Sequence, residues 1–547
     1  MGEYKVFIPC AGIGSRLELK YNKALVTVGQ KPAITYIIDK FPKEVEIVIA
    51  LGYNGSNIKQ VLNTIYPDRK FTYINIKPYE GLNSGLGVTL LQSASVLQCP
   101  FIFCSCDTIV EEEIPPPSYN WMGYADFLPT NGIVTLSEDF VGQYRSVNID
   151  FKDHTISEIC SKHSKGSVPY IGLAGIYDYK LFWKMMQSGQ ELGSLEQGEV
   201  YGFKYLETIH ALPFTWYDTG NKTSLMYARS KFDDIIDANI LPKDDEAIWF
   251  INGKVIKFST DSNFIDKRVK RSCDLTGYIP YVTHSDENLY VYDQQSGTIL
   301  SNCLNANRFE DLLKYLTNFW QPISLNKLNK QQEYTNFIDA CNKFYHTKTR
   351  QRIKQYFRTF EQIDQIEYIN GLFTPKIEQI LEKVDWKWLC VGLPTTRFHG
   401  DLHFENILDT QTSFIFLDWR QDFAGLTEYG DLYYDLAKLN HGIIISHELI
   451  DKNLFDHSVQ RNIINFDFLQ KNTSIKLEGR FKKFVKEHGY DYRKVQYLTY
   501  LIFLNIAALH HYPYSLLLFH LGKFGLWQLV KEDNDDKILD SLINQYN

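Results

Sequence analysis

Three residues of one segment have the types and spacing of a phosphotransfer site. The segment TTRFHGDLHFENILDTQTSFIFLDWR carries Asp401, then Asn406, and then Asp418 at the end of an apolar run. In phosphotransfer loops an Asp meets the substrate hydroxyl, an Asn about five residues later binds Mg²⁺, and a second Asp beyond it binds metal. The spacing therefore predicts Asp401 as a catalytic residue and Asn406 and Asp418 as magnesium ligands.

Two alternatives exist for the same segment. His399, Asp401 and His403 alternate and could chelate the metal of a hydrolase, or the whole segment could be a solvated hairpin. Zinc sites, however, usually place His residues on one helix face and add a distant acid. We therefore expect the two histidines to shape the loop.

A second candidate site lies near the N-terminus. In PCAGIGSRLELKYNKALVTVGQKP, Gly12, Gly14 and Ser15 follow an apolar run, and Arg16 and Lys23 come next. Glycines let backbone N–H groups approach a phosphate chain, and a helix N-terminus favours negative charge. The spacing fits neither GxxxxGK[ST] nor GxGxxG, so the glycines alone fit a tightly packed turn equally well.

The elements that must position this N-terminal site alternate between strands and helices. Apolar runs predict strands at 4–8, 45–51, 71–76 and 101–104, with helices at 34–40, 57–64 and 87–97. That order is typical of a doubly wound parallel sheet. Ligands bind such sheets at the carboxyl ends of the strands, where residues 9–16 and Asp107 fall.

The pattern changes near residue 230. The acidic stretch DDIIDANILPKDDE resembles a linker, and AIWFINGKVIKF predicts a hairpin that turns at Asn252-Gly253. From about residue 306 the chain is mostly helical. We therefore predict an α/β protein with two domains, 1–235 and 236–547, the second made of an N-lobe at about 245–305 and a helical lobe at about 306–547.

Four motifs in the N-terminal half resemble the sugar-phosphate nucleotidyltransferase family. They are AGIGSRL with its downstream NKALV and KP, then NSGLGVTLL (83–91), FCSCDTI (103–109) and WYDTGN (216–221). The resemblance implies a Rossmann-like fold and transfer of a nucleotidyl group from an NTP to a phosphorylated acceptor, with release of pyrophosphate. Two departures are Cys106, where Gly usually precedes the metal Asp, and Cys10, where Ala is common.

The resemblance also implies roles for residues of these motifs. Asp107 and Asp218 would hold Mg²⁺, a hard cation that prefers carboxylates and phosphate oxygens, while Arg16 and Lys23 would clamp the pyrophosphate and the α-phosphate. Lys162 would bind the acceptor phosphate, and a solvated surface lysine is the alternative for this loosely matched position. The nucleotide-binding residues would include Ala11, Gly12, Gly14, Ser15, Gly85 and Gly87.

The C-terminal half resembles the aminoglycoside phosphotransferase and choline kinase family. The motifs are HGDLHFENIL, FLDWR and the following YGDLYYDLAKL, which contains Asp431 and Asp435. The resemblance implies a bilobal, protein-kinase-like domain that uses ATP and Mg²⁺. For Asp431 and Asp435 a structural role as caps is an equal alternative.

The expected N-lobe has a lysine in a strand. Lys257 of GKVIKF matches the lysine that pairs with the ATP phosphates, but no GxGxxG precedes it. The next helix offers Asp266 or Asp274 as its acidic partner, and the sequence does not choose between them.

Composition limits the partners. The chain of 547 residues has a net charge of −8 and no long Lys/Arg block, which argues against nucleic acid. Nine scattered cysteines and an N-terminus without a signal-peptide pattern indicate a cytoplasmic protein. The apolar stretch 498–521 contains several polar residues that a membrane span would bury at a cost, so we expect no membrane insertion.

Together the two halves predict a bifunctional enzyme. It would phosphorylate a small alcohol or sugar with ATP and then couple the phosphorylated product to an NTP, with CTP slightly favoured by analogy. The product would serve the decoration of surface polysaccharide or lipid. The alternatives are a nucleotidyltransferase with a C-terminal pseudokinase or substrate-binding domain, and a non-catalytic nucleotide-binding assembly protein. The acceptor and the oligomeric state stay open.

Overall fold

The protein is described by a computed structural model that covers residues 3–125, 144–160, 168–191, 198–232, 243–323 and 331–546, without the side chains of residues 331, 474 and 536–546. These residues form two compact units. The first contains residues 3–232, 243–265 and 283–294, and the second contains residues 266–282 and 295–546. A domain boundary at residue 235 stays a prediction; the compact units assign part of the expected N-lobe to the first unit.

The first unit is built on a nine-stranded sheet. Its strand order is β5 (Phe71–Asn75), β4 (Glu46–Leu51), β1 (Lys5–Cys10), β6 (Phe101–Cys104), β11 (Val168–Ile176), β8 (Trp121–Ala125), β12 (His210–Phe214), β10 (Thr155–Ile159) and β9 (Ser146–Asp150). The first four are parallel, as the sequence predicts. β11 runs antiparallel to β6, so the complete sheet is mixed.

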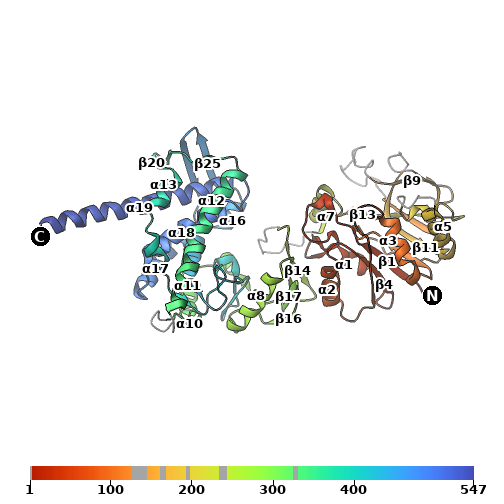
Figure 1. Cartoon of the computed structure of the whole chain (residues 1–547), viewed down its shortest axis with the longest axis horizontal. Helices are drawn as coiled ribbons and strands as arrows, with labels where there is room; N and C mark the ends of the chain where they lie inside the picture. Colours follow the sequence, from red (N-terminus) through yellow and green to blue (C-terminus); the bar gives the residue numbers. More distant parts are fainter. Residues whose placement is uncertain are drawn as a thin grey trace. The chain divides into compact units, whose positions relative to one another are not determined.

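Helices cover both faces of this sheet because its strands are apolar on both sides. Alternate residues of β1 enter different cores: Val6 and Ile8 join α1 (Ala33–Ile38) and α2 (Gly55–Ile65), whereas Phe7 joins α3 (Leu86–Ser93) and α5 (Tyr179–Glu191). Figure 1 shows these elements in red to yellow. Further helices of the first unit are η1 (Ser15–Leu17), η2 (Lys23–Leu25), η3 (Ala94–Val96), α6 (Val200–Phe203) and α7 (Lys222–Phe232).

Smaller strand pairs complete the first unit. β2 (Thr27–Val28) pairs with β3 (Lys31–Pro32), and β7 (Thr108–Val110) pairs with β13 (Trp216–Asp218). A four-stranded sheet has the order β14 (Glu246–Ile251), β15 (Lys254–Ser259), β17 (Leu289–Asp293) and β16 (Val282–Asp286). The β14–β15 hairpin turns at Asn252-Gly253, both at positive φ as such a turn requires. Its Trp249, Ile256 and Phe258 belong to the core shared by β1 and α1.

The second unit is mainly helical. Its helices are α8 (Ser262–Asp274, which begins in the first unit), α9 (Leu300–Cys303), α10 (Ala306–Phe319), α11 (Gln331–Asn342), α12 (Lys348–Thr359), α13 (Ile377–Lys383), α14 (Trp386–Cys390), α15 (Leu432–Ile444), α16 (His447–Asp451), α17 (Asn472–Glu487), α18 (Tyr492–Ala507) and α19 (Tyr514–Tyr546). A π-helical turn, η6 (Lys343–Thr347), joins α11 to α12. α18 packs against α12, α15 and α19, and Figure 1 shows α12, α18 and α19 side by side.

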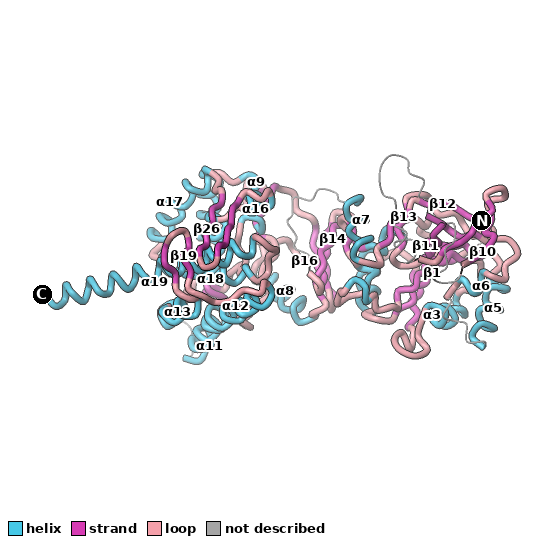
Figure 2. Tube along the Cα trace, turned by 90° about the horizontal axis from the view of Figure 1, so that it is seen from above, coloured by secondary structure: helices cyan, strands magenta, loops and turns pink. Residues whose placement is uncertain are grey.

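Three small sheets accompany these helices. β18 (Thr298–Ile299), β22 (Ile407–Asp409) and β23 (Phe414–Phe416) form one, and β21 (Pro394–Thr395) pairs with β24 (Gly430–Asp431). The third has the order β20 (Leu372–Thr374), β19 (Glu367–Ile369), β26 (Ile463–Phe468) and β25 (Phe455–Gln460), with β19 beside β26 in Figure 2. Within the described ranges, no helix combines the length and apolar character that crossing a membrane requires.

Candidate active sites

The first candidate site lies at the carboxyl end of β1 and β6. Lys23 Nζ is 2.5 Å from Asp107 Oδ2, and both side chains are largely buried. Burial opposes ionisation of Asp107, but the positive charge of Lys23 lowers its pKa overall. The same pairing raises the pKa of Lys23 against the effect of burial. The site therefore holds a buried ion pair that is charged at neutral pH.

Two more of the predicted residues converge on this pair. A Cβ placed on Gly220 would lie 2.7 Å from Asp107 Oδ2, 3.0 Å from Asp218 Oδ1 and 3.3 Å from a terminal nitrogen of Arg16. The β7–β13 ladder explains the approach of the two acids, since it sets Asp218 opposite Thr108, the residue after Asp107. Only a residue without a side chain fits at 220 without displacing these groups.

Asp218 is surrounded by donors. The Tyr144 hydroxyl donates to Asp218 Oδ2 at 2.6 Å, the Asn221 amide donates to the same oxygen at 2.9 Å, and the backbone N–H of Gly220 donates to Oδ1 at 2.9 Å. Burial and the negative charge of Asp107 nevertheless raise the pKa of Asp218. Two acids that repel one another in a buried site are suited to bind a divalent cation.

The glycine-rich turn fits close against Lys23. Gly14 has a φ of +70°, and a Cβ there would lie 3.1 Å from the Cβ of Lys23. Gly12, Ser15 and Arg16 are exposed, whereas Ala11 is buried and accepts a backbone hydrogen bond from the N–H of Tyr53. Gly85, at φ +140°, is the N-cap of α3, and the buried Gly87 lies in the first turn.

Two further predicted residues are the lysines Lys162 and Lys257. Lys162 lies outside the described residues. Lys257 lies on β15, opposite Tyr290 of β17, and belongs to the first unit, whereas Asp401, Asn406 and Asp418 belong to the second. Of its two possible acidic partners, Asp266 forms an ion pair with Lys270 at 2.6 Å.

The second candidate site contains the loop around Asp401. The carboxylate of Asp435 holds the backbone of this loop. It accepts hydrogen bonds from the backbone N–H groups of His399 at 2.8 Å and Gly400 at 2.7 Å. His399 Nδ1 accepts the N–H of Asp401, and its Nε2 lies 2.8 Å from the carbonyl of Leu417. Burial lowers the pKa of His399 to about 4, so the ring is neutral and its Nε2–H donates to Leu417.

Asp401 itself makes contacts with three side chains. Lys438 Nζ is 2.7 Å from its Oδ1, His403 Nε2 is 3.6 Å from Oδ2, and the amide of Asn406 donates to Oδ2 at 3.3 Å and to the backbone carbonyl at 3.0 Å. Burial opposes ionisation, but Lys438 and His403 hold the pKa of Asp401 well below its usual value. Against burial, Asp401 and Glu405 raise the pKa of His403 to about 9. Asp401 is therefore ionised and fixed in orientation.

Asp418 follows β23 and has a φ of +56°, a backbone conformation that is uncommon for Asp and frequent at functional sites. Its Oδ1 is 2.5 Å from a terminal nitrogen of Arg268 on α8. Lys267 of the same helix pairs with Asp422 at 2.9 Å, and Arg271 donates to the carbonyls of Phe398 and Arg420. α8 therefore presents a row of cations to the catalytic loop.

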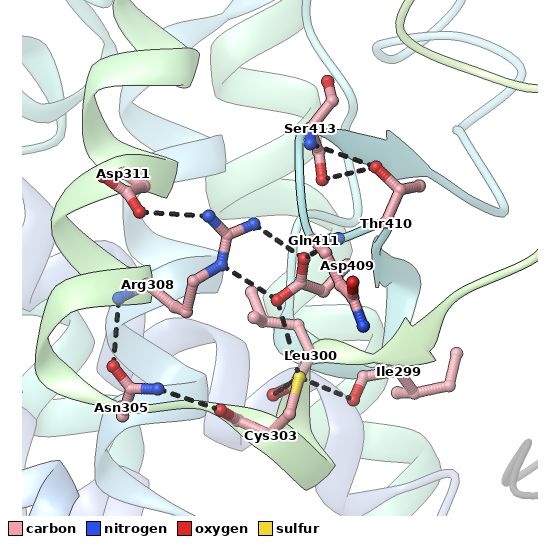
Figure 3. A network of polar contacts seen from close by, with 10 residues as sticks. All are labelled: Ile299, Leu300, Cys303, Asn305, Arg308, Asp311, Asp409, Thr410, Gln411 and Ser413. Carbon is pink, nitrogen blue, oxygen red and sulfur yellow. Dashed lines mark hydrogen bonds and ion pairs between the residues drawn. The ribbon is translucent and has the colours of Figure 1, made fainter.

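The hairpin that joins Asn406 to Asp418 is anchored to α10. Figure 3 shows Arg308 donating to both carboxylate oxygens of Asp409, at 2.9 Å to Oδ2 and 2.6 Å to Oδ1. The N–H of Gln411 also donates to Asp409, at 2.7 Å, and Cys303 Sγ lies 3.7 Å from it. Bidentate pairs of this kind fix geometry as well as charge, so the network anchors to α10 the hairpin at whose two ends Asn406 and Asp418 lie.

Asp431 and Asp435 have structural contacts. Asp431 caps α15 by accepting the N–H of Tyr433, and it also accepts the hydroxyl of Tyr345 at 2.6 Å. Burial raises the pKa of Asp435 to about 6. Lys438, one turn further along α15, reaches Asp401, and sequence reasoning missed it. Its signal was the spacing of three residues after Asp435 in DLAKL.

Across the described ranges, no group of three or more His, Cys, Asp or Glu side chains could hold a metal. The predicted magnesium sites each use two protein ligands, which suits Mg²⁺ because it keeps waters and phosphate oxygens in its coordination shell.

Similarity to known proteins is found among solved structures. No protein-family model matches the chain, and no curated protein matches it.

The N-terminal part is similar to solved nucleotidyltransferase structures. UDP-glucose pyrophosphorylase from Acinetobacter baumannii has 16% identity and a TM-score of 0.34, covering 42% of this chain and 93% of that one. A putative glucose-1-phosphate thymidylyltransferase from Bacillus anthracis has 19% identity and a TM-score of 0.34, covering 44% and 98%. HddC from Yersinia pseudotuberculosis has 19% identity and a TM-score of 0.30, covering 42% and 100%. TM-scores this low carry no conclusion about activity, so the function proposed for this chain rests on its own residues.

Proposed function

We propose that the chain is a bifunctional transferase that activates a small hydroxylated compound in two steps. The second unit transfers the γ-phosphoryl group of ATP to a hydroxyl, and the first unit couples the phosphorylated product to an NTP. CTP is the NTP that we propose first. The resulting nucleotide-linked compound is a building block for surface polysaccharide or lipid.

The observation that carries the proposal is the convergence of Arg16, Asp107 and Asp218 around Gly220, with Lys23 on Asp107. An oxygen of the acceptor phosphate attacks the α-phosphorus, the bond to the bridging oxygen breaks, and pyrophosphate leaves. The attacking group is already an anion, so the step needs charge neutralisation and no general base. Arg16 and Lys23 bind phosphate oxygens, and the exposed backbone of Gly12 and Ser15 lies against the phosphate chain.

In the second unit, Asp401 orients the hydroxyl. As the hydroxyl oxygen bonds to the γ-phosphorus, the bond to ADP breaks and the proton passes to Asp401. Lys438 keeps Asp401 ionised before the step. The Asn406 amide nitrogen is turned toward Asp401, and this contact fixes the side chain.

The residues of both sites fit Mg²⁺. Asp107 and Asp218 would hold it in the first unit and Asn406 and Asp418 in the second, where bound Mg²⁺ neutralises charge on the phosphate oxygens. The proposed ligands of the first unit lie at the β7–β13 ladder, and those of the second unit lie at the two ends of the β22–β23 hairpin, which supports this assignment.

One observation favours a second candidate, an active nucleotidyltransferase with a C-terminal pseudokinase. Arg268 is paired with Asp418 at 2.5 Å and holds a carboxylate that the kinase mechanism assigns to metal. In that case the second unit binds nucleotide or substrate without turnover.

The test uses purified full-length protein with ATP, a panel of NTPs and candidate alcohols, and measures ADP and pyrophosphate separately. We expect Asp401→Asn to abolish ADP formation alone and Asp107→Asn to abolish pyrophosphate release from an added phosphorylated acceptor. Exposed Asp339→Asn and Asp68→Asn are the matched controls for the two units. If ADP formation survives Asp401→Asn, the kinase assignment is wrong. If pyrophosphate release survives Asp107→Asn, the assignment of the first unit is wrong.

A further inference from the structure

The second unit has a group of cations beside Asp401 that the two-step scheme does not use. Lys348 Nζ lies 4.1 Å from the centre of the Phe344 ring, and the Arg420 guanidinium lies 4.8 Å from the centre of the same ring. Arg352 is one turn after Lys348, on the same face of α12. We call Lys348, Arg352 and Arg420 the basic cluster.

The basic cluster has no matching acids. Among the ion pairs of the described residues, none involves Lys348, Arg352 or Arg420. Arg420 Nε is buried without a hydrogen-bond partner. Asp401, whose charge acts on Lys348, is already paired with Lys438 at 2.7 Å. Cations packed together without counter-charge cost free energy, which an anion bound between them would offset.

The electrostatics of the folded unit agree with this arrangement. Burial, together with the charges of Arg420, Lys438 and Arg352, lowers the pKa of Lys348 to about 6, and Asp401 acts in the opposite direction. Burial and Arg420 also lower the pKa of Arg352. Lys348 therefore lies close enough to both arginines and to the catalytic Asp401 for their charges to act on it.

A narrow pocket opens at the basic cluster. Its lining includes Lys348, Phe344, Tyr434 and Asn505, and its volume is about 10 Å³, room for about one water molecule. Asn505 Oδ1 is buried there without a hydrogen-bond partner. The π-helical turn η6, which carries Phe344 and leads directly into Lys348, is a feature that often marks functional sites. The pocket therefore brings Lys348 together with an aromatic wall and an unpaired amide oxygen, whereas Arg352 and Arg420 are not part of its lining.

We propose that the basic cluster binds an acidic group of the acceptor, so that the second unit acts on a small hydroxylated acid, bearing a carboxylate or a phosphate, and rejects cationic amino alcohols. The proposal rests on the proposed kinase function of the second unit. The hydroxyl to be phosphorylated faces Asp401, while the acid sits on Lys348 and its neighbours. Because the pKa of Lys348 is about 6 in the free protein, a bound acid would favour its protonation, and a cationic acceptor would be repelled by Arg352 and Arg420.

The γ-phosphate of ATP is the other anion that could meet these residues, and the experiment separates the two. Full-length protein is first saturated with Mg²⁺ and a non-hydrolysable ATP analogue, and binding of glycerol 3-phosphate, glycerate, glycerol and choline is then measured by calorimetry. We expect the two acids to bind and glycerol and choline to bind at least about tenfold more weakly, as the loss of a charged hydrogen bond implies.

Variants identify the residues responsible. Lys348→Met should weaken binding of the acids about tenfold and leave glycerol and ATP-analogue binding unchanged. Lys354→Met, an exposed lysine of the same helix, is the matched control and should change nothing. The proposal is overturned if acids and glycerol bind equally, or if Lys348→Met weakens the ATP analogue instead. ADP formation with the same four compounds tests the kinase itself: acid binding without turnover would refute the kinase function and retain the acid-binding site.

Discussion

Replacement of Lys348 by Met should make the protein more stable at neutral pH, by an amount that depends on pH. The side chain is held among Arg420, Lys438 and Arg352, and burial with these charges lowers its pKa to about 6 from a usual value of 10.5. Met has similar length and keeps the contact with the Phe344 ring, but carries no charge to lose.

The sign follows from proton binding. Between pH 6 and pH 10.5 the unfolded chain binds a proton at Lys348 that the folded chain does not, so the stability of the wild type rises with pH in this window. Each pH unit changes the free energy of unfolding by up to about 1.4 kcal/mol. The advantage of Lys348→Met should therefore shrink by up to about 2–3 kcal/mol between pH 7 and pH 9.

The assay is urea unfolding of wild type and Lys348→Met at pH 7, 8 and 9, followed by circular dichroism. Lys354→Met should give the same difference from wild type at every pH, since this side chain is exposed. A difference between wild type and Lys348→Met that stays constant from pH 7 to pH 9 would refute the claim that Lys348, half-buried among cations, is uncharged in the folded protein.

Three further substitutions test other parts of the structure. Gly220→Ala places a methyl group 2.7 Å from Asp107 Oδ2 and 3.0 Å from Asp218 Oδ1. It should lower pyrophosphate release at least about tenfold and leave ADP formation unchanged. Pyrophosphate release equal to that of wild type would show that the two carboxylates do not act together. Arg268→Gln should tighten binding of Mg²⁺–ATP a fewfold, about 1 kcal/mol, by releasing Asp418, and weaker binding measured by calorimetry would instead show that Arg268 contacts the nucleotide. Asp435→Asn removes a charged acceptor from the backbone N–H groups of His399 and Gly400. It should lower the free energy of unfolding, measured with urea, by about 3 kcal/mol. An unchanged urea midpoint would contradict the role of Asp435 in holding the loop.

Local patterns predicted much of the first unit. The apolar runs at β1, β4, β5 and β6 are strands, and neighbouring strands among them pair in parallel. Asn252-Gly253 turns the β14–β15 hairpin because both residues tolerate positive φ. These features depend on neighbouring residues and on periodicity, which a single sequence displays.

Contacts between distant residues could not be predicted in the same way. Tyr144 donates to Asp218 across 74 residues of sequence, and Arg268 reaches Asp418 across 150. Neither partner lies in a motif, and long-range pairing depends on the complete fold. The basic cluster has the same origin: Lys348 of α12 and Arg420 of the loop after β23 are distant in sequence and meet at Phe344 only in the folded unit.

The roles of Asp431 and Asp435 illustrate a different limit. The spacing in the sequence predicts Asp431 and Asp435 on one helix. It does not distinguish a structural role as helix caps from a catalytic role. In the structure Asp431 is the N-cap of α15, while Asp435 accepts two loop N–H groups. The geometry of donors around a carboxylate, which spacing does not contain, decides between such roles.

The central claim is that one chain carries out two consecutive transfers on the same compound. The most direct measurement is ³¹P NMR of wild-type protein with ATP, CTP, Mg²⁺ and glycerate, with Asp401→Asn and Asp107→Asn in parallel. The account predicts a nucleotide-linked product with wild type, no phosphorylated intermediate with Asp401→Asn, and accumulation of that intermediate with Asp107→Asn. Accumulation of the same species in both variants, or a nucleotide-linked product from Asp401→Asn, would contradict it.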